Sequence, residues 1–349
     1  MTLALGLGCG GGDGGSGSTA DGGRADAFRP DLGPPDLGTP DLGPPPPEPV
    51  RFFLLGDTGE GNDAQYAVAA VMKDLCDSEG CDFAVLLGDN IYDAGVDGVD
   101  DAQWQSKFEQ PYAELDIPFF AVMGNHDYGG SLLGIDTGGL GNEWDKGPVA
   151  VRYSDVSDKW VMDDTHYTFT WDTVGFIMLD SNAILWDEDV HGEQRDWYPS
   201  ALSEVGDAEW VIAAMHHPFR SQGRHGNAGR YESIEVGGEE IPLPVPIMDG
   251  RFHRDFMEEV VCGTVDIAVS GHDHNRQWLD EADRCGGTEL IVSGAGAKTT
   301  DFVDARGNDL FWGDDTKPGF LYVVVDGNTL TGQFYDLDGN MEFERQLVH

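Results

Sequence analysis

Five short clusters of acidic and histidine residues occur in order along this chain, and each follows an apolar, strand-like run. Carboxylate, amide and imidazole groups are the ligands that hard and borderline metal ions take in proteins, and several of them must converge to hold an ion. Five clusters in this order predict a hydrolase that uses two metal ions. The clusters are Gly56-Asp57-Thr58-Gly59, Gly88-Asp89-Asn90-Ile91-Tyr92, Gly124-Asn125-His126-Asp127, Met215-His216-His217-Pro218 and Gly271-His272-Asp273-His274.

The residue types in these clusters suggest different roles in metal binding. Asp89 is the natural bridge between two cations, because Asn90 and Tyr92 crowd the same turn. Tyr92 is unusual, since a phenol with a pKa near 10 loses its proton at neutral pH only beside a highly charged cation. If Tyr92 binds metal, the first ion is expected to be ferric.

The last cluster presents its histidines at alternate positions. In an extended segment alternate side chains face the same way. We therefore expect His272 and His274 to point into the site and Asp273 to point elsewhere. Asn125 and His216 add a neutral amide oxygen and a further imidazole nitrogen.

Strands and helices must bring these clusters together. Strands are predicted at 51–55, 83–87 and 119–123, with helices at 62–76 and 102–115 between them, and this alternation favours parallel pairing. Ligand sites of such sheets lie at the carboxyl ends of the strands, where the clusters fall. Further strands are predicted at 167–171, 175–180, 210–215 and 265–270, helices at 193–205 and 252–261, and antiparallel strands at 289–293, 320–325, 329–335 and 343–348.

The composition limits the partners. The chain has 349 residues, 40% of them hydrophobic, and a formal net charge of −44 from 64 acidic and 20 basic residues. A field of this sign repels nucleic acid and anionic membranes, so we expect no nucleic-acid partner. High solubility is the simplest explanation of the acidity.

The first 49 residues differ in composition from the rest. Leu7-Gly8-Cys9 after an apolar stretch is typical of a bacterial lipoprotein processing site, although the preceding segment is short and carries no Lys or Arg; an ordinary apolar N-terminus is the alternative. Residues 10–49 are rich in Gly, Ser and Pro and repeat the pattern Asp-Leu-Gly-x-Pro, which favours an extended tether over a recognition element. We therefore predict a signal and tether at 1–49 and a catalytic domain at 50–349.

Four further cysteines indicate the compartment. Cys76, Cys81, Cys262 and Cys285 permit three pairings, and we favour 76–81 and 262–285 because both close local loops. Disulfides require an oxidising compartment, so we expect an extracytoplasmic protein that is secreted, periplasmic or lipid-anchored through Cys9. No run of about 18 apolar residues suitable for spanning a membrane occurs in the sequence.

The cluster pattern resembles the purple acid phosphatases, a group within the calcineurin-like metallophosphoesterases, and most closely the small tartrate-resistant type. The resemblance covers about residues 50–325 and includes Ser293-Gly294-Ala295-Gly296. Thr58-Gly59 follows Asp57, where most calcineurin-like enzymes have the motif Asp-x-His, and Tyr92 is retained. The resemblance implies an α/β fold of two packed mixed β-sheets flanked by helices.

The resemblance also implies roles for individual residues. Fe(III) would be held by Asp57, Asp89, Tyr92 and His274, and a divalent ion (Fe(II), Zn or Mn) by Asp89, Asn125, His216 and His272. His126 would contact the substrate phosphate and protonate the leaving group, with Asp127 orienting it. His225, in a His-Gly pair, would line the substrate site, whereas His217 falls where the family varies.

The implied activity is acid phosphatase. Two cations about 3.5–4 Å apart would bind a small phosphomonoester and share the attacking hydroxide, with inorganic phosphate as product. We expect a monomer. One alternative is a phosphodiesterase or nucleotidase on the same metal site, which loops 128–144 and 220–246 would decide. Another is a non-catalytic surface lipoprotein, against which the intact cluster residues argue.

Overall fold

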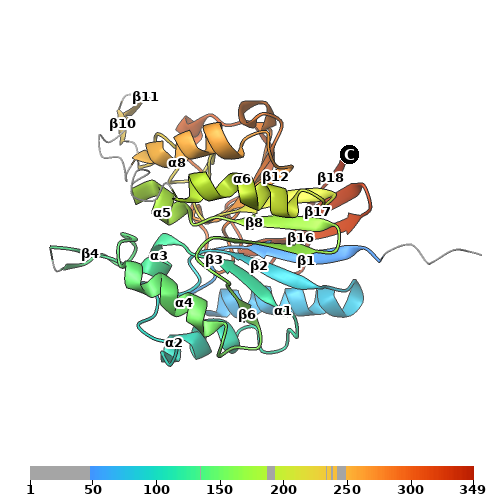
Figure 1. Cartoon of the computed structure of the whole chain (residues 1–349), viewed down its shortest axis with the longest axis horizontal. Coiled ribbons are helices and arrows are strands. Elements are labelled where there is room, and N and C mark those ends of the chain that lie inside the picture. The colour runs from blue at the N-terminus through green and yellow to red at the C-terminus, as the bar shows by residue number, and fades with distance from the viewer. Residues whose placement is uncertain (1–47, 134, 187–192, 233, 237–238, 242–248) are drawn as a thin grey trace, which may run out of the picture. The chain divides into compact units, whose positions relative to one another are not determined.

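Two seven-stranded β-sheets form the centre of the computed structural model, which describes residues 48–133, 135–186, 193–232, 234–236, 239–241 and 249–349 (Figure 1). In the first sheet β1, β2, β3 and β6 are parallel, and β16, β17 and β18 continue the sheet antiparallel from the other side of β1. Its order is β18 (Met341–Val348), β17 (Thr329–Asp336), β16 (Gly319–Asp326), β1 (Val50–Leu55), β2 (Phe83–Leu87), β3 (Phe119–Val122) and β6 (Trp160–Val161).

The second sheet is also mixed. Strands β8, β9, β12 and β14 are parallel, while β7, β13 and β15 pair antiparallel at its two sides. Its order is β15 (Leu310–Asp314), β13 (Arg276–Leu279), β14 (Glu289–Ser293), β12 (Ile267–Ser270), β9 (Trp210–Ala214), β8 (Val174–Met178) and β7 (Tyr167–Trp171). Two short hairpins stand apart: β4 (Ser131–Leu132) with β5 (Ile135–Asp136), and β10 (Ile234–Val236) with β11 (Glu239–Ile241).

Helices cover the outer faces of both sheets (Figure 1). On the first sheet lie α1 (Asp63–Ser78), α2 (Ala102–Trp104) and α4 (Gly147–Tyr153), and on the second lie α5 (Ser181–Trp186), α6 (Glu193–Val205) and α8 (Arg251–Phe256). The short α3 (Asn125–Tyr128) follows β3, π-helical turns follow α2 and α8, and 3-10 turns occupy Trp144–Lys146, Ala282–Cys285 and Asp304–Arg306. The predicted fold, two packed mixed sheets flanked by helices, is confirmed.

The two sheets are joined by an aromatic core. Phe52 of β1 meets Phe176 of β8 edge to face, with ring centroids 5.4 Å apart, and Phe120 of β3 stacks on Phe169 of β7 at 3.8 Å. Three of these rings are buried and Phe169 is half-buried. Burying such a side chain contributes roughly 1.5–3 kcal/mol, so the packing fixes one sheet against the other and with it the distance between the strand ends.

Several predicted elements differ in extent. The helix expected at 102–115 ends earlier, because α2 passes into a π-helical turn at Gln105–Glu109 and then into turns. Strand β13 was not predicted, since it begins with Arg276 and Gln277, both polar yet fully buried. The Arg276 guanidinium is neutralised there by Asp314 at 2.8 Å and Glu342 at 2.7 Å, partners that local sequence does not reveal.

Both favoured disulfides are present, Cys76–Cys81 and Cys262–Cys285. Among the described residues, no helix has the length and apolar character needed to cross a membrane. The predicted lipidation site at Cys9 and almost all of the predicted tether at 1–49 lie outside the described residues.

Candidate metal centre

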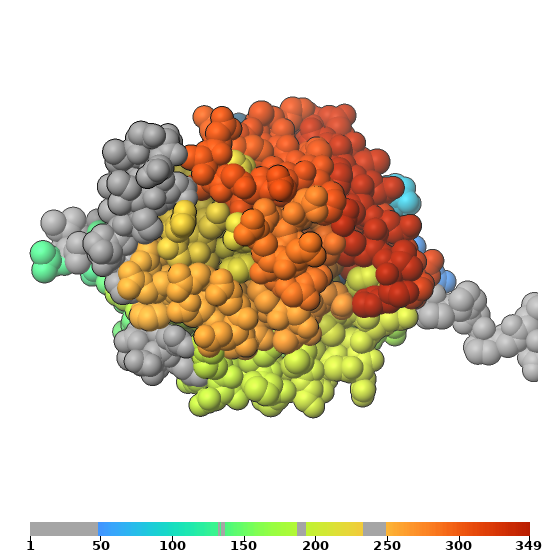
Figure 2. Space-filling view, turned by 90° about the horizontal axis from the view of Figure 1, so that it is seen from above, coloured from blue at the N-terminus to red at the C-terminus, as the bar shows by residue number. Residues whose placement is uncertain are grey.

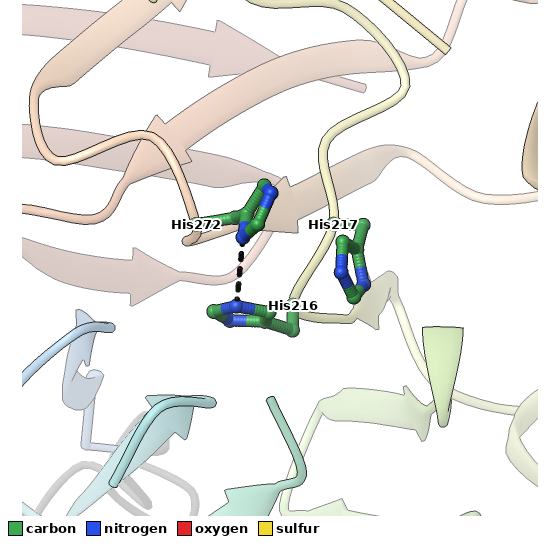
Figure 3. A group of neighbouring side chains, drawn as sticks. All are labelled: His216, His217 and His272. Carbon is green, nitrogen blue, oxygen red and sulfur yellow. Dashed lines mark hydrogen bonds between the residues drawn. The ribbon is translucent and has the colours of Figure 1, made fainter. Parts of the chain in front are cut away.

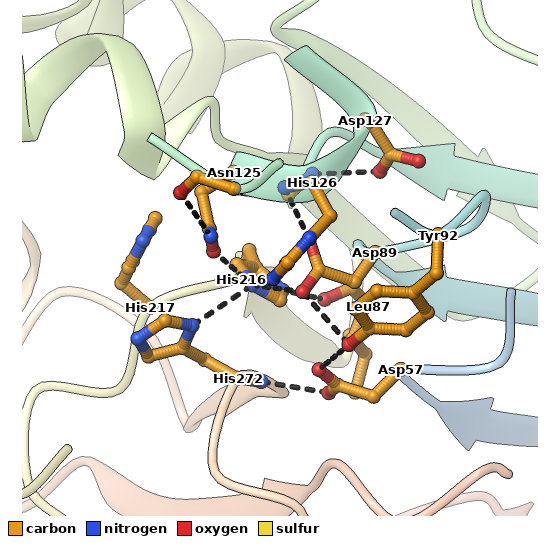
Figure 4. Close-up of polar contacts among 12 residues, drawn as sticks. Asp57, Leu87, Asp89, Tyr92, Asn125, His126, Asp127, His216, His217 and His272 are labelled. Carbon is orange, nitrogen blue, oxygen red and sulfur yellow. Dashed lines mark hydrogen bonds and ion pairs between the residues drawn. The ribbon is translucent and has the colours of Figure 1, made fainter. Parts of the chain in front are cut away.

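Strands from both sheets end at one place and bring the five clusters together (Figure 4). Asp57, Asp89 and Asn125 follow β1, β2 and β3 of the first sheet, while His216 and His272 follow β9 and β12 of the second. Parallel strands present their carboxyl ends at the same edge, and the stacking of the two sheets places these edges side by side.

Four side chains form the first group of possible metal ligands. The Tyr92 hydroxyl lies 2.8 Å from Asp57 Oδ1, 2.8 Å from Asp89 Oδ2 and 3.2 Å from His274 Nε2. His274 Nε2 is in turn 3.3 Å from Asp57 Oδ1. The structure thus brings together two carboxylates, a phenol and an imidazole, the four residues expected to hold the first ion.

A second group shares one atom with the first. His216 Nε2 lies 3.4 Å from Asp89 Oδ2, 3.1 Å from Asn125 Oδ1 and 3.1 Å from His272 Nδ1. Asp89 Oδ2 therefore faces both groups, the position that a bridging ligand between two ions requires. Its other oxygen, Oδ1, accepts the backbone N–H of His126 at 2.8 Å.

The backbone at the clusters is tightly bent. Asp57, Asp89 and His272 have positive φ angles of 58°, 51° and 69°, values that non-glycine residues adopt mainly where the surrounding structure imposes them. A Cβ on Gly124 would lie 2.2 Å from Asp89 Oδ1, so only glycine fits there. His272 and His274 both face the site as expected, but they reach it from this bent loop and not from an extended segment.

The electrostatics of the site favour a cation. Burial would lower the pKa of His216, yet Asp89 and Asp57 outweigh it and raise that pKa to about 9. Burial, together with the same two carboxylates, raises the pKa of the Tyr92 phenol well above its ordinary value. The carboxylates that favour a protonated imidazole in this buried site would also favour metal cations. The donor groups therefore fit the two ions that the sequence predicts.

Surrounding groups hold the ligands in orientation. His216 Nδ1 lies 2.8 Å from the Leu87 carbonyl, which can only accept, so Nε2 is left for a metal ion. The Ser181 hydroxyl accepts the backbone N–H of His216 at 3.2 Å and that of His217 at 2.9 Å. Lys298 places its ammonium 3.2 Å from the centroid of the Tyr92 ring. Ser181 and Lys298 were not predicted, because neither lies in a cluster.

Asp127 makes contacts that were not predicted from the sequence. Its carboxylate accepts backbone N–H groups of Asn90, Ile91 and Gly124 at 2.8–2.9 Å. Asp127 thus ties the turn after β2 to the turn after β3. On the His126 ring, Nδ1 lies 2.6 Å from the carbonyl of Asp93, which accepts its proton.

His225 reaches the same site from the long loop after β9. Its ring centroid lies 4.0 Å from that of His272, and its Nδ1 pairs with Glu232. Burial would lower the pKa of His225, but the bond to Glu232 and the charge of Asp273 outweigh it and raise the pKa. Asp273, which points away from the ligand groups, accepts the backbone N–H of His225 at 2.8 Å. Neither Glu232 nor this role of Asp273 was predicted.

A cleft of about 380 Å³ opens beside these groups. Both His126 and His225 line it, so the structure places the two predicted substrate-contacting histidines on one cavity. Its other walls include Leu140, Leu185 and Trp186, an apolar contribution that the clusters did not indicate.

His217 lies beside His216 and His272, although the sequence predicted no role for it in the site (Figure 3). Ring nitrogens of His216, His217 and His272 all lie within 4.8 Å of one another. His217 Nδ1 is 3.0 Å from the Ser181 hydroxyl, and burial together with the charge of His216 lowers the pKa of His217 well below its ordinary value. His217 is thus a neutral neighbour of the second group.

Comparison with known proteins defines the class. The family model described as calcineurin-like phosphoesterase matches residues 50–276, and the chain belongs to this family. Family, fold and donor geometry together identify a phosphoesterase with a binuclear metal site.

More particular similarities lie within that class. The chain is 26% identical to purple acid phosphatase 3 of Arabidopsis thaliana over 310 residues, which cover 84% of this chain and 76% of that protein. It is 22% identical to tartrate-resistant acid phosphatase type 5 of Homo sapiens, covering 85% and 90% of the two chains. Among solved structures, GAP50, described as the anchor in the inner membrane complex of Plasmodium, matches with a TM-score of 0.66 at 20% identity, covering 86% of this chain and 89% of that one.

Proposed function

We propose that this protein is an acid phosphatase of the purple acid phosphatase type, which hydrolyses small phosphomonoesters to an alcohol and inorganic phosphate. The observation that carries the proposal is the position of Tyr92. Its hydroxyl contacts Asp57, Asp89 and His274 at 2.8, 2.8 and 3.2 Å, so a phenol joins the first ligand group. A phenolate is a strong ligand for Fe(III) and a poor one for divalent ions at neutral pH.

Two ions would occupy the two groups. Fe(III) would be held by Asp57, Asp89, Tyr92 and His274, and Fe(II), Zn or Mn by Asp89, Asn125, His216 and His272. When bound, the ions supply positive charge for the phosphate and acidify the attacking water. Binding would displace the proton from His216, whose Nδ1–H stays on the Leu87 carbonyl.

Two histidines would act on the substrate. Because the Asp93 carbonyl accepts from Nδ1 of His126, the protonated ring can give up its Nε2 proton to the departing alkoxide while keeping its orientation. His225, whose pKa the pair with Glu232 raises, would bind a phosphate oxygen when protonated. Both side chains line the cleft beside the ligand groups.

The rival activities need separate experiments. The expected result is a purple protein with two metals per chain and at least 10-fold higher kcat/KM for p-nitrophenyl phosphate than for bis-p-nitrophenyl phosphate. A colourless protein with zinc or manganese alone would overturn the ferric assignment. A preference for the diester would overturn monoester specificity, and two bound metals without turnover of any ester would make the chain a binding protein.

We also propose that the enzyme is an exported monomer, held on a tether of residues 10–49 with Cys9 as its lipid attachment point. The two disulfides support an oxidising compartment. Radiolabelled palmitate incorporated by intact cells into the wild type but not into Cys9→Ala would establish the anchor. Equal labelling of both proteins would refute it.

A further inference from the structure

A second cavity, of about 700 Å³, is lined in part by the same loop that carries His225. The loop contributes His225, Tyr231 and Glu232 to the catalytic cleft, and Arg220 and 227–230 to this second cavity. The segments around the cavity, coloured from yellow to orange-red, lie next to one another on the face seen in Figure 2. The lining consists of Phe219, Arg220, Asn227, Ala228, Gly229, Arg230, Arg254, Glu258, Arg284, Ala305 and Arg306.

The charge of this lining is opposite to that of the protein. Five of the chain's 20 lysine and arginine residues line it, although the chain as a whole carries a net charge of −44. Among the described lining residues the one carboxylate is that of Glu258. Solubility explains an acidic surface but does not explain why so many of the few cations gather around one cavity.

Contacts with the protein hold several of the guanidinium groups in place. The buried carboxylate of Glu281 lies 3.2 Å from Arg220 Nε and 2.6 Å from Arg284 Nε, and so fixes two of them. Arg306 donates from Nε to the Gly223 carbonyl at 3.3 Å. It also packs over Gly226, where an added Cβ would lie 2.6 Å from the guanidinium carbon. Protein contacts thus orient three of the five guanidinium groups.

Their positive charges are close enough to repel one another. Burial, with the charges of Arg284 and Arg230, lowers the pKa of Arg220 even though Glu281 and Glu258 raise it. Among the described residues, the carboxylates that face these five arginines are those of Asp255, Glu258 and Glu281, with Glu232 near Arg306. An anion in the cavity would relieve the remaining repulsion.

We propose that this arginine-lined cavity binds a phosphate group, at a site separate from the metal centre. Arginine forks match the oxygens of phosphate and make charge-assisted hydrogen bonds, which are stronger than neutral ones. The acidic surface repels anions, so a local basic cavity beside the cleft would concentrate them near the reaction. The phosphate is either free inorganic phosphate or a second phosphate of the substrate.

Phosphate titration of the full-length, metal-loaded protein tests the site. The Arg230→Gln/Arg254→Gln double variant removes two cations whose side chains are exposed or half-exposed and leaves the pair with Glu281 intact. By isothermal titration calorimetry at low salt, we expect one wild-type phosphate-binding event to weaken at least 10-fold in this variant. Arg152→Gln, an exposed arginine on α4, is the matched control and should bind like the wild type.

Arg284→Gln provides a second test, since its side chain is 65% exposed and its loss should not impair folding. Wild-type phosphate stoichiometry and affinity in both variants would overturn the proposal. The comparison does not depend on catalysis, because it measures a difference in phosphate binding whether or not the metal centre turns over monoesters.

Kinetics identify the source of the phosphate. If it belongs to the substrate, the double variant raises KM for a doubly phosphorylated sugar at least 5-fold and leaves KM for the matching monophosphate unchanged. If it is free phosphate, both KM values stay at the wild-type level and the change appears in the titration alone.

Discussion

Replacing Asp89 by Asn should separate the two ligand groups, because they differ in charge. The first group keeps Asp57 and Tyr92, two groups that can be anionic. The second group, with Asn125, His216 and His272, has no anionic member other than Asp89. We therefore expect Asp89→Asn to lose the divalent ion while the first ion, and with it the purple colour, remains.

The size of the effect follows from the geometry. Asp89 Oδ2 is 3.4 Å from His216 Nε2, so an ion among the second group would lie within about 4 Å of the removed charge. At that separation a unit charge pair contributes about 4 kcal/mol at an effective dielectric constant of 20. Because the ion carries two charges, this value is a lower bound, and we expect a loss of affinity for the divalent ion of at least roughly 10³-fold, with activity falling at least as far.

Metal content by mass spectrometry, the visible spectrum and kcat on p-nitrophenyl phosphate measure the three consequences. Asp180→Asn is a matched control, since Asp180 is equally buried and accepts hydrogen bonds from Tyr128 and Ala183, outside both ligand groups. It should keep both metals. Two tightly bound metals in Asp89→Asn would refute the bridging role, and loss of both metals with the colour would show that the groups are not independent.

Three further predictions concern single side chains. Tyr92→Phe should fold and bind metal but lose the visible absorption band; a retained band in the spectrum would remove Tyr92 from the first group. His126→Ala should lower kcat at least 10-fold more for an alkyl phosphate than for p-nitrophenyl phosphate, because the poorer leaving group needs the proton, and equal losses would exclude proton donation. Burial lowers the pKa of His253 from 6.5 to about 4, so its contribution to stability is complete above pH 6.5 and is lost as the pH falls towards 4. Between pH 6.5 and 5 this loss is roughly 1–2 kcal/mol, and His253→Leu should abolish that part of the decline in denaturant titrations; an unchanged pH dependence would contradict it.

Much of the architecture can be predicted from local sequence. Apolar runs such as Phe83–Leu87 and Glu289–Ser293 form strands with the predicted bounds, because each is short, rich in β-forming residues and bounded by turn residues. Helix α6 likewise spans the predicted 193–205. Elements whose stability comes from distant partners were missed, as with β13, where the buried Arg276 depends on Asp314 and Glu342.

The sequence alone indicated which side chains could bind metal and favoured the cysteine pairing that the structure shows. Gly-Asp, Gly-Asn and Gly-His turns at strand ends are local signals, because a ligand that must approach its neighbours closely needs a glycine beside it, as Gly124 shows against Asp89. The family resemblance then supplied the expected roles. That these side chains converge followed from the rule that parallel strands end at a common edge.

Only the tertiary structure decided which partners each side chain of the site contacts. It places Asp89 Oδ2 between the two groups, brings the Asp93 carbonyl to the His126 ring, and pairs His225 with Glu232. It also gathers five arginines, scattered from residue 220 to residue 306, around one cavity. The physical reason is the same in each case: a hydrogen bond or ion pair depends on ångström-scale distances between segments, and those distances are set by the packing of two sheets and not by local sequence.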